Sequence, residues 1–269
     1  MLGSKQGLPY TVRWSQCVAR KGPPGVSIAE EVRPATVSVS GRAPVTRDRI
    51  LQAAIALADR GGLESLSMRK LAADLQIEAA SLYYHVRNRG DLLDGMADVV
   101  FGEMGRPSPG EEWKAALGKR AASTREVLVR HPWAIPIIDS RTTPGAATLR
   151  YLEDAIAFLR EAGFSIAMAA HVLSVLDSYV RGFAMQEVSL PLDPGGSIEA
   201  ATESILEQQP MMSNAYPHLA EMAGALILQP GYAYGNEFSF GLGLILDGLE
   251  SARASDRDVS ATQRDSDAG

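Results

Sequence analysis

The stretch "SMRKLAADLQIEAASLYYHVRNRGDLLDGM", from Ser67 to Met96, decides the fold of this protein. Ser67 is a typical N-cap residue, and apolar residues recur behind it at helical spacing, at Met68, Leu71, Ala72 and Leu75. "QIEA" then interrupts the pattern as a turn, before a second short helix expected over Ala79–Val86. Two short helices around a tight turn predict a helix-turn-helix. The alternative is an ordinary helical hairpin inside a larger core.

Further helices are expected on both sides of this pair. Thr46 is a plausible N-cap, and Ile50, Ala54, Leu57 and Ala58 follow it on one helical face. Gly61-Gly62 is expected to end that helix. Asn88 is followed three positions later by Asp91, which resembles a capping box and predicts a fourth helix.

Adjacent tyrosines stand on the very short helix predicted over residues 79–86. Leu82 and Val86 are four positions apart and can be buried together, whereas Tyr83 and Tyr84 are each rotated by about 100° from the preceding residue. At least one of the two rings must therefore point outward, where a DNA backbone and thymine methyl groups would suit it. The alternative is that one tyrosine packs on the first helix and the other is merely exposed.

Charge favours the DNA interpretation locally. The chain has a formal net charge of −6, which argues against nucleic-acid binding over its whole surface. Between Arg42 and Arg89, however, eight Lys or Arg residues face five Asp or Glu residues, a surplus of three positive charges. A basic segment within an acidic chain is expected where a protein meets phosphates.

Composition excludes several other classes of protein. Strand-forming residues are sparse and Ala, Leu, Arg and Glu are common, so an all-α fold is expected. Cys17 is the only cysteine, which fits a reducing compartment, and we expect a cytoplasmic protein with no membrane partner and no secretory signal. No metal-spaced ligand pair, nucleophile elbow or phosphate loop is present, so no enzyme, cofactor or metal site is expected.

Residues 45–96, including "AASLYYHV" and the following "NRGDLL", resemble the DNA-binding segment of the tetracycline-repressor (TetR) family. This resemblance implies a regulator that binds double-stranded operator DNA of palindromic sequence. It assigns Arg69 to a base and Arg89 to a phosphate. It places the remaining DNA-contacting residues at Ser67, Ala79, Ala80, Tyr83, Tyr84 and His85. Ala79 and Ala80 replace a glutamine and a proline of the namesake, so the operator sequence should differ.

The rest of the chain is similar, more weakly, to the C-terminal domain of the tetracycline repressor. The similarity rests on "EEWKAAL", on the segment from Tyr151 to Glu187 and on "FSFGLGLILDGLE". It implies a small-molecule effector and a homodimer formed through a four-helix bundle. For the dimer interface it favours one stripe of the last helix, at Phe238, Gly241, Leu242, Ile245 and Leu249. The alternative is that this is an ordinary core helix.

The resemblance also implies where an effector would bind. The histidine and glutamate that hold magnesium-tetracycline in the namesake fall on Asp139 and Gln186, while Arg120 and Thr124 fall on two further drug contacts. The chelating set is therefore broken, although Asp139 and Glu187 leave a cation site as the less favoured alternative to a surface acid pair. We expect a mainly apolar, anionic or carbonyl-rich effector, with further lining residues at Ile138, Leu173 and Asp177.

These observations divide the chain into four parts. Residues 1–45 form an extension predicted to be disordered, 46–92 the helix-turn-helix domain, 93–254 the effector-binding and dimerisation domain, and 255–269 a disordered tail. Helices of the larger domain are expected over residues 113–130, 146–162, 165–188, 198–207, 218–228 and 237–254. One helical turn is expected between Pro132 and Pro144, and His171 is expected in the core. The predicted function is a repressor released by a small molecule. The alternative is a ligand-binding or interaction protein whose helix-turn-helix no longer reads DNA.

Overall fold

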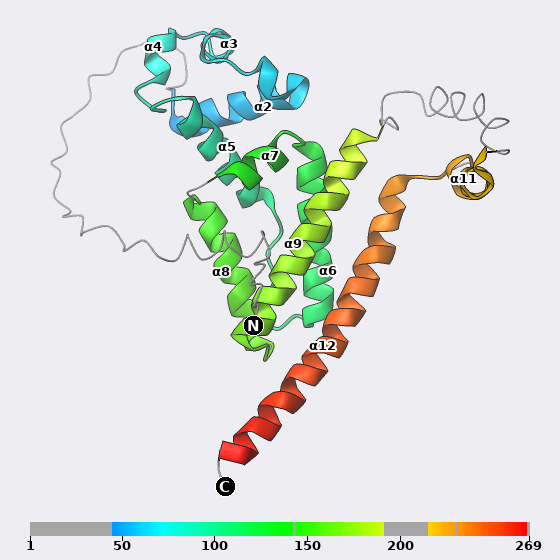
Figure 1. The fold of residues 1–269 in the computed structure, drawn as a ribbon. Helices are drawn as coiled ribbons and strands as arrows, with labels where there is room; N and C mark the ends of the chain where they lie inside the picture. The colour runs from blue at the N-terminus through cyan, green and yellow to red at the C-terminus, as the bar shows by residue number, and fades with distance from the viewer. Residues whose placement is uncertain (1–44, 142–143, 191–214, 230, 268–269) are drawn as a thin grey trace, which may run out of the picture.

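The computed structural model describes residues 45–141, 144–190, 215–229 and 231–267, and every regular element in these ranges is helical (Figure 1). The N-terminal part contains α2 (Arg47–Ser65), α3 (Met68–Asp74) and α4 (Ala79–Leu82). Helix α5 (Arg89–Glu103) leads from it into the larger part. The all-α fold predicted from the sequence is confirmed, whereas residues 1–44 and the helix predicted over 198–207 lie outside the described residues.

The larger part is built on five consecutive helices. Helices α7 (Ala134–Ser140) and α8 (Ala146–Glu161) pack on α5, and α9 (Ile166–Ser189) packs on α8 and on α6 (Trp113–Arg130). Helix α12 (Glu237–Asp267) runs alongside α9 and then extends past the end of the bundle (Figure 1). Between them lie α11 (Pro217–Met222), the π-helical turn η1 (Ala223–Ile227) and the short helix η2 (Tyr234–Asn236).

The helix starts near the N-terminus follow the capping residues of the sequence. The side chains of Thr46, Ser67 and Asn88 accept hydrogen bonds from the backbone N–H groups of Arg49, Lys70 and Asp91, which satisfies donors that have no partner inside a helix. Behind the caps, the apolar faces of α2, α3 and α4 meet α5 in a small core that contains Ile50, Leu71, Leu82 and Met96.

Several helix boundaries differ from the predicted ones. Gly61 and Gly62 do interrupt α2 with non-helical backbone, at a φ of 68° for Gly62, but helical turns resume as far as Ser65. The helix expected over Ala79–Val86 ends at Leu82, and a turn follows. Helix α7 is two turns long rather than one, because Pro136 falls in its first turn, where no intrahelical N–H bond is lost.

The C-terminal helix is longer than predicted. It was expected to end at Ala254, with a disordered tail from residue 255, but α12 continues to Asp267. The sequence after Gly248 contains neither Gly nor Pro before residue 269, so nothing in the backbone chemistry stops a helix that packing against α9 has already started.

Helix α5 is the element that joins the two parts. Its first half packs on α2, whereas its second half packs on α7 and α8. Asp98, in the middle of α5, accepts hydrogen bonds from the backbone N–H groups of Ala147 and Thr148 and from the Thr148 hydroxyl, at 3.0–3.1 Å. This carboxylate therefore caps the start of α8, where the N-cap residue Gly145 has no side chain to do so.

Candidate functional site

The helix-turn-helix presents one exposed surface formed by α3, α4 and the turn that follows, which we call the reader surface. Leu82 and Val86 are fully buried, whereas Tyr83 and Tyr84 are 53% and 88% exposed. Both rings point outward, so the expectation that at least one of them does so is confirmed. Neither tyrosine is buried.

The other residues predicted to contact DNA lie on or beside this surface. Arg69, Ala79, Ala80 and Arg89 are exposed and His85 is half-buried. Ser67 is exposed as well, but its hydroxyl accepts the Lys70 N–H group at 3.2 Å and so also caps α3. One guanidinium N–H group of Arg89 donates to the carbonyl of Leu63 at 3.2 Å, which holds the start of α5 close to the end of α2.

A buried cluster of polar side chains lies at the centre of the larger part. The side chain of Arg120 is almost fully buried, and both of its terminal nitrogens lie 3.3 Å from Oδ1 of Asp177. Its guanidinium also stacks 4.3 Å over the ring of Tyr151, whose hydroxyl lies 2.9 Å from Oγ1 of Thr124. Burial raises the pKa of Tyr151 to about 12, so this phenol stays neutral and available for hydrogen bonding.

This cluster borders a small cavity. The cavity holds about 20 Å³, roughly the space of one water molecule, and is bordered by side chains of all five consecutive helices α5 to α9. Its lining residues are Phe101, Met104, Thr124, Leu128, Ile138, Tyr151, Asp177 and Arg181. The Nε atom of Arg120 is buried beside it with no hydrogen-bond partner, which is costly for a cationic group.

The residues predicted for the effector site divide into two groups. Thr124, Ile138 and Asp177 line the cavity, Arg120 pairs with Asp177 beside it, and Leu173 is buried one turn earlier on α9. Asp139 and Gln186 do not reach it. The side chain of Asp139 is 56% exposed beside Arg181, and Gln186 accepts a hydrogen bond from the Tyr234 hydroxyl at 2.6 Å.

The two carboxylates of the alternative cation site, Asp139 and Glu187, each lie beside an arginine. Glu187 is engaged in an ion pair with Arg125 instead. Within the described ranges, no group of three or more His, Cys, Asp or Glu side chains is arranged to hold a metal ion.

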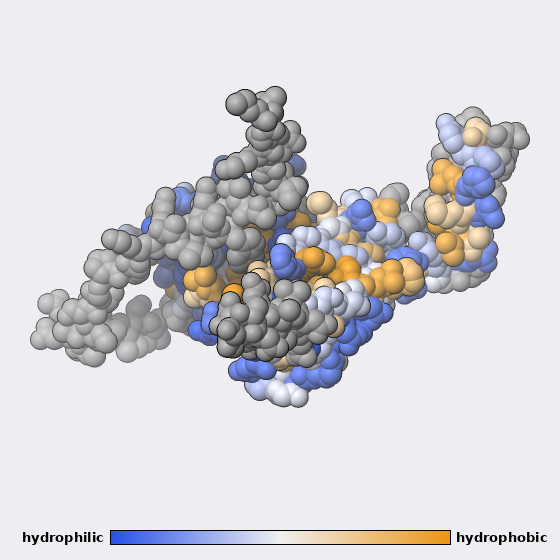
Figure 2. Space-filling model, turned by 60° about the horizontal axis from the view of Figure 1, so that its bottom comes forward, coloured by the Kyte–Doolittle hydropathy of each residue, from blue (hydrophilic) through white to orange (hydrophobic). Residues whose placement is uncertain are grey.

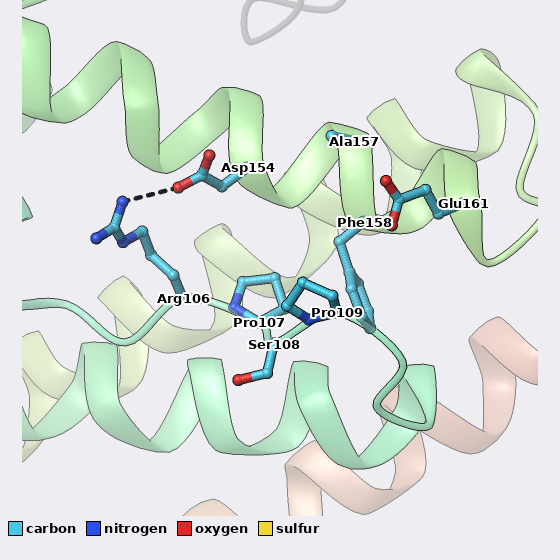
Figure 3. A pocket seen from close by; sticks show the side chains of 8 residues that line it. All are labelled: Arg106, Pro107, Ser108, Pro109, Asp154, Ala157, Phe158 and Glu161. Atoms are coloured by element: carbon cyan, nitrogen blue, oxygen red, sulfur yellow. Dashed lines mark hydrogen bonds and ion pairs between the residues drawn. The ribbon is translucent and has the colours of Figure 1, made fainter.

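A second, larger pocket opens on the surface of the larger part (Figure 3). It has a volume of about 570 Å³ and lies between the loop that precedes α6 and one side of α8. Pro107, Pro109 and Phe158 form an apolar wall, and Arg106 pairs with Asp154 at 2.9 Å across the rim. None of the predicted effector residues lines this pocket, whose charged residues are the Arg106–Asp154 pair and Glu161. The smaller cavity is therefore the better candidate for ligand recognition.

Most positions of the stripe predicted for the dimer interface are covered by their own chain. Phe238, Leu242 and Leu249 are buried within their own chain, where Phe238 stacks on Tyr179 at a centroid distance of 5.4 Å. A side chain at Gly241 would collide with the Tyr179 ring, so this glycine serves the contact between α9 and α12. Ile245 is half-buried against the same core.

The outward side of α12 carries a different apolar pair. Phe240 and Leu244 are 69% and 60% exposed. On the neighbouring helix α9, Val175 and Met185 are exposed among small residues that include Ser174, Ser178 and Gly182. His171 also lies on this exposed side, so its predicted place in the core is wrong. We call the exposed residues of α9 and α12 named in this paragraph the outward face.

More apolar surface is exposed beyond this face. Figure 1 shows α11 standing apart from the five-helix bundle, and Figure 2 shows hydrophobic surface on that arm as well as on the body. The exposed apolar side chains of the arm are Tyr216, Leu219, Met222 and Leu226. None of the described helices is both long and apolar enough to span a bilayer.

Comparison with known proteins identifies two matching family models. Residues 50–96 match the model of bacterial regulatory proteins of the tetR family. Residues 106–253 match the model of the tetracyclin repressor-like C-terminal domain.

Individual relatives cover most of the chain. The HTH-type transcriptional repressor DrrR1 of Streptomyces coeruleorubidus is 33% identical over 81% of this chain and 82% of its own length. The class A tetracycline repressor protein from transposon 1721 of Escherichia coli is 30% identical over 81% of this chain and 96% of its own length. Among solved structures, ActR of Streptomyces coelicolor in complex with actinorhodin has a TM-score of 0.63 at 29% identity. That alignment covers 78% of this chain and 99% of ActR.

Proposed function

The chain belongs to the TetR family of transcriptional regulators, and from this premise we propose that it represses transcription until a small organic effector releases it from operator DNA. Homodimers are typical of the family, and a dimer places two reader surfaces on a palindromic operator. The protein then acts in the cytoplasm, as a regulator rather than an enzyme.

The reader surface is the observation that carries this proposal. Tyr84 is 88% exposed, although a large aromatic ring gains nothing from water, while Leu82 and Val86 hold the same segment in the core. Arg69 and Arg89 flank the aromatic residues and are exposed, and neither forms an ion pair with a carboxylate of the described residues. This combination favours a DNA-binding helix-turn-helix over the alternative in which the motif no longer binds DNA.

The release mechanism follows from the position of the cavity. Phe101 of α5 and Met104 directly after it line the cavity, and the start of α5 packs in the reader core. A cavity of about 20 Å³ is far too small for an organic effector, for which pockets of about 300 Å³ or more are usual. An effector that enters must therefore displace helices, and a shift of α5 changes the spacing of the two readers. The effector lowers operator affinity by its preference for the displaced arrangement.

The charges beside the cavity indicate the class of effector. Asp177 and Arg181 line the cavity, and Arg120 pairs with Asp177 beside it. Arg181 also faces Asp139 outside the cavity, whereas Nε of Arg120 lacks a partner. An anionic or carbonyl-rich group would accept the unused N–H, and the aromatic and aliphatic lining would contact an apolar body. The similarity to ActR, which has been crystallised with actinorhodin, makes that compound the first probe to test.

Two experiments test the proposal. Duplex DNA selected from a random library by the purified protein should bind, by fluorescence anisotropy, about a thousandfold more tightly than scrambled DNA. Equal binding of selected and scrambled DNA would leave the ligand-binding alternative. In calorimetry with actinorhodin, Arg120→Gln should lower the affinity, while Arg106→Gln at the surface pocket serves as the matched control and should not.

A further inference from the structure

His131 occupies the junction between the two parts of the protein. It follows Arg130, the last residue of α6, and its backbone N–H donates to the carbonyl of Val127 at 2.9 Å. Its imidazole ring is buried, with only 5% of the side chain exposed. Neither the reader surface nor the effector cavity includes this residue. The "RHPW" motif of residues 130–133 is therefore unexplained by the proposed function alone.

The imidazole lies between two carboxylates from different helices. Nδ1 lies 2.7 Å from Oδ1 of Asp59 on α2, and Nε2 lies 3.2 Å from Oε2 of Glu103 at the end of α5. The indole Nε1 of Trp133 donates to the same Asp59 oxygen at 2.6 Å. We call Asp59, Glu103, His131 and Trp133 the Asp59 clasp.

The geometry of the clasp depends on one proton. The charged and titratable groups that face the ring are Asp59 of α2, Glu103 of α5 and Arg130 of α6, which donates to Glu103 at 2.8 Å. A neutral imidazole has one donor and one acceptor, whereas an ionised carboxylate only accepts. Both contacts of His131 are hydrogen bonds only when the ring is the doubly protonated cation. In the neutral ring, one nitrogen lone pair faces a carboxylate oxygen.

The clasp forms a second connection between the cavity and the reader, separate from α5. Helix α6 contributes Thr124 and Leu128 to the cavity and ends beside His131, and α7 begins just after Trp133 and contributes Ile138. Through Asp59 these two helices are bonded directly to α2, the helix on which α3 packs. A displacement of α6 or α7 therefore acts on the reader at a point other than the start of α5.

We propose that the Asp59 clasp fixes the reader in its operator-binding orientation, and that it holds fully only while His131 is protonated. The proposal rests on the proposed function, because orientation has meaning only for a protein that reads two half-sites. The small volume of the cavity supports the assignment to the operator-binding state, since that arrangement is the one an effector must disrupt. His131 is thus a positioning residue, with no contact to DNA or effector.

The test uses the full-length protein and the DNA duplex selected by the wild type. Operator affinity is measured for the selected duplex and for duplexes with one base pair added or removed between the half-sites. Trp133→Phe keeps an aromatic ring but removes the indole N–H, and His131→Gln removes the titrating group. Each variant should bind the selected duplex about tenfold more weakly, as expected for loss of a hydrogen bond to a charged group. Each should also discriminate less between spacer lengths, while its base preference stays unchanged.

The pH dependence gives an independent readout. Operator binding should weaken more steeply with rising pH in the wild type than in His131→Gln, because a neutral ring cannot donate to both carboxylates. Asp154→Asn, which breaks an ion pair at the surface pocket, is the matched control and should retain the wild-type spacer profile and pH slope.

The outcomes separate the clasp from the proposed function. If no DNA is selected, the proposed function fails. If DNA is selected but both variants keep the wild-type spacer profile and His131→Gln keeps the wild-type pH slope, the clasp is refuted while the function stands. If His131→Gln loses its far-UV helical signal, Trp133→Phe decides the spacer test and Asp59→Asn, which keeps the shape of the side chain but removes its charge, decides the pH test.

Discussion

Arg47, the first residue of α2, is bonded to Asp91 in the first turn of α5, with Nη2 lying 2.9 Å from Oδ1. Nη1 of the same guanidinium donates to the carbonyl of His85 at 2.7 Å. Arg47 therefore ties together α2, the end of the reader segment and the start of α5. The hydrogen bond from Arg47, supported by the backbone N–H of Arg87, lowers the pKa of Asp91 to about 2.

Replacing this carboxylate should destabilise the protein in a pH-dependent way. Because the pKa of Asp91 is lower in the folded state than its ordinary value of 3.8, its contribution is complete above about pH 4 and is lost as the pH falls toward 2. Asp91→Asn should lower the free energy of unfolding at pH 7 by about 1 to 2 kcal/mol, a value reduced for the partial exposure of Arg47. Urea unfolding at several pH values measures it. A gap between wild type and variant that stays constant down to pH 2 contradicts the prediction.

Arg69 is expected to contact a base. It is exposed at the start of α3, one residue after Met68. Arg69→Ala should cost about 1 to 3 kcal/mol of operator binding and relax the preference at one base-pair position. Anisotropy titrations with single-base variants of the operator measure both effects. Equal weakening on all sequences would assign Arg69 to the phosphate backbone instead.

Arg89 is expected to contact a phosphate, so its loss should be independent of DNA sequence. Arg89→Ala should weaken specific and nonspecific DNA by similar factors and reduce the slope of log affinity against log salt by about one. Arg89→Lys, which keeps the charge, is the matched control and should retain most of the slope. A changed base preference in Arg89→Ala would show that this residue reads sequence.

Magnesium-tetracycline should not bind. Asp139 lies outside the cavity beside Arg181, and Gln186 has no carboxylate and is bonded to Tyr234, so the cavity has no pair of metal-binding groups at these positions. Calorimetry with tetracycline should show no heat of binding that depends on magnesium. Submicromolar binding that a chelator abolishes would show that the residue correspondence with the tetracycline repressor is wrong.

The outward face should form the dimer interface. Phe240→Glu or Leu244→Glu places a charge where another apolar helix surface is expected, so the protein should sediment as a monomer in analytical ultracentrifugation. Leu149→Glu on α8 changes an equally exposed leucine elsewhere and should remain a dimer. Dimers that persist in both Phe240→Glu and Leu244→Glu would move the interface to another surface.

The reader was predictable from sequence because its signals are local. Thr46, Ser67 and Asn88 cap helices with their own side chains, and Leu82 and Val86 are buried at the spacing that one helical turn demands. These features depend on residues a few positions apart, so they survive in any tertiary context.

The larger part was less predictable because its signals are not local. The periodicity of α12 predicts a buried stripe at Phe238, Leu242 and Leu249. It does not determine whether the same chain or a second copy of the protein covers this stripe. No sequence pattern predicts the contacts of His131, since Asp59 and Glu103 lie far away in sequence and only the fold brings them to its ring. The place of Asp139 outside the cavity could not be predicted either, because the direction of a side chain on α7 depends on where that helix begins.

The uninterrupted course of α5 sets a rule for anyone who builds hybrid sensors from this protein. Asp91 and Asp98 belong to one continuous helix, so no flexible joint lies between the DNA-reading and ligand-sensing parts at which to cut and rejoin. A hybrid must be spliced within a helix, where each residue added or removed turns everything beyond it by about 100°. Ligand binding will therefore alter DNA binding in a hybrid only when the helical phase is preserved. In a series of hybrids whose junctions differ by single residues, proteins that respond to the ligand should alternate with proteins that do not.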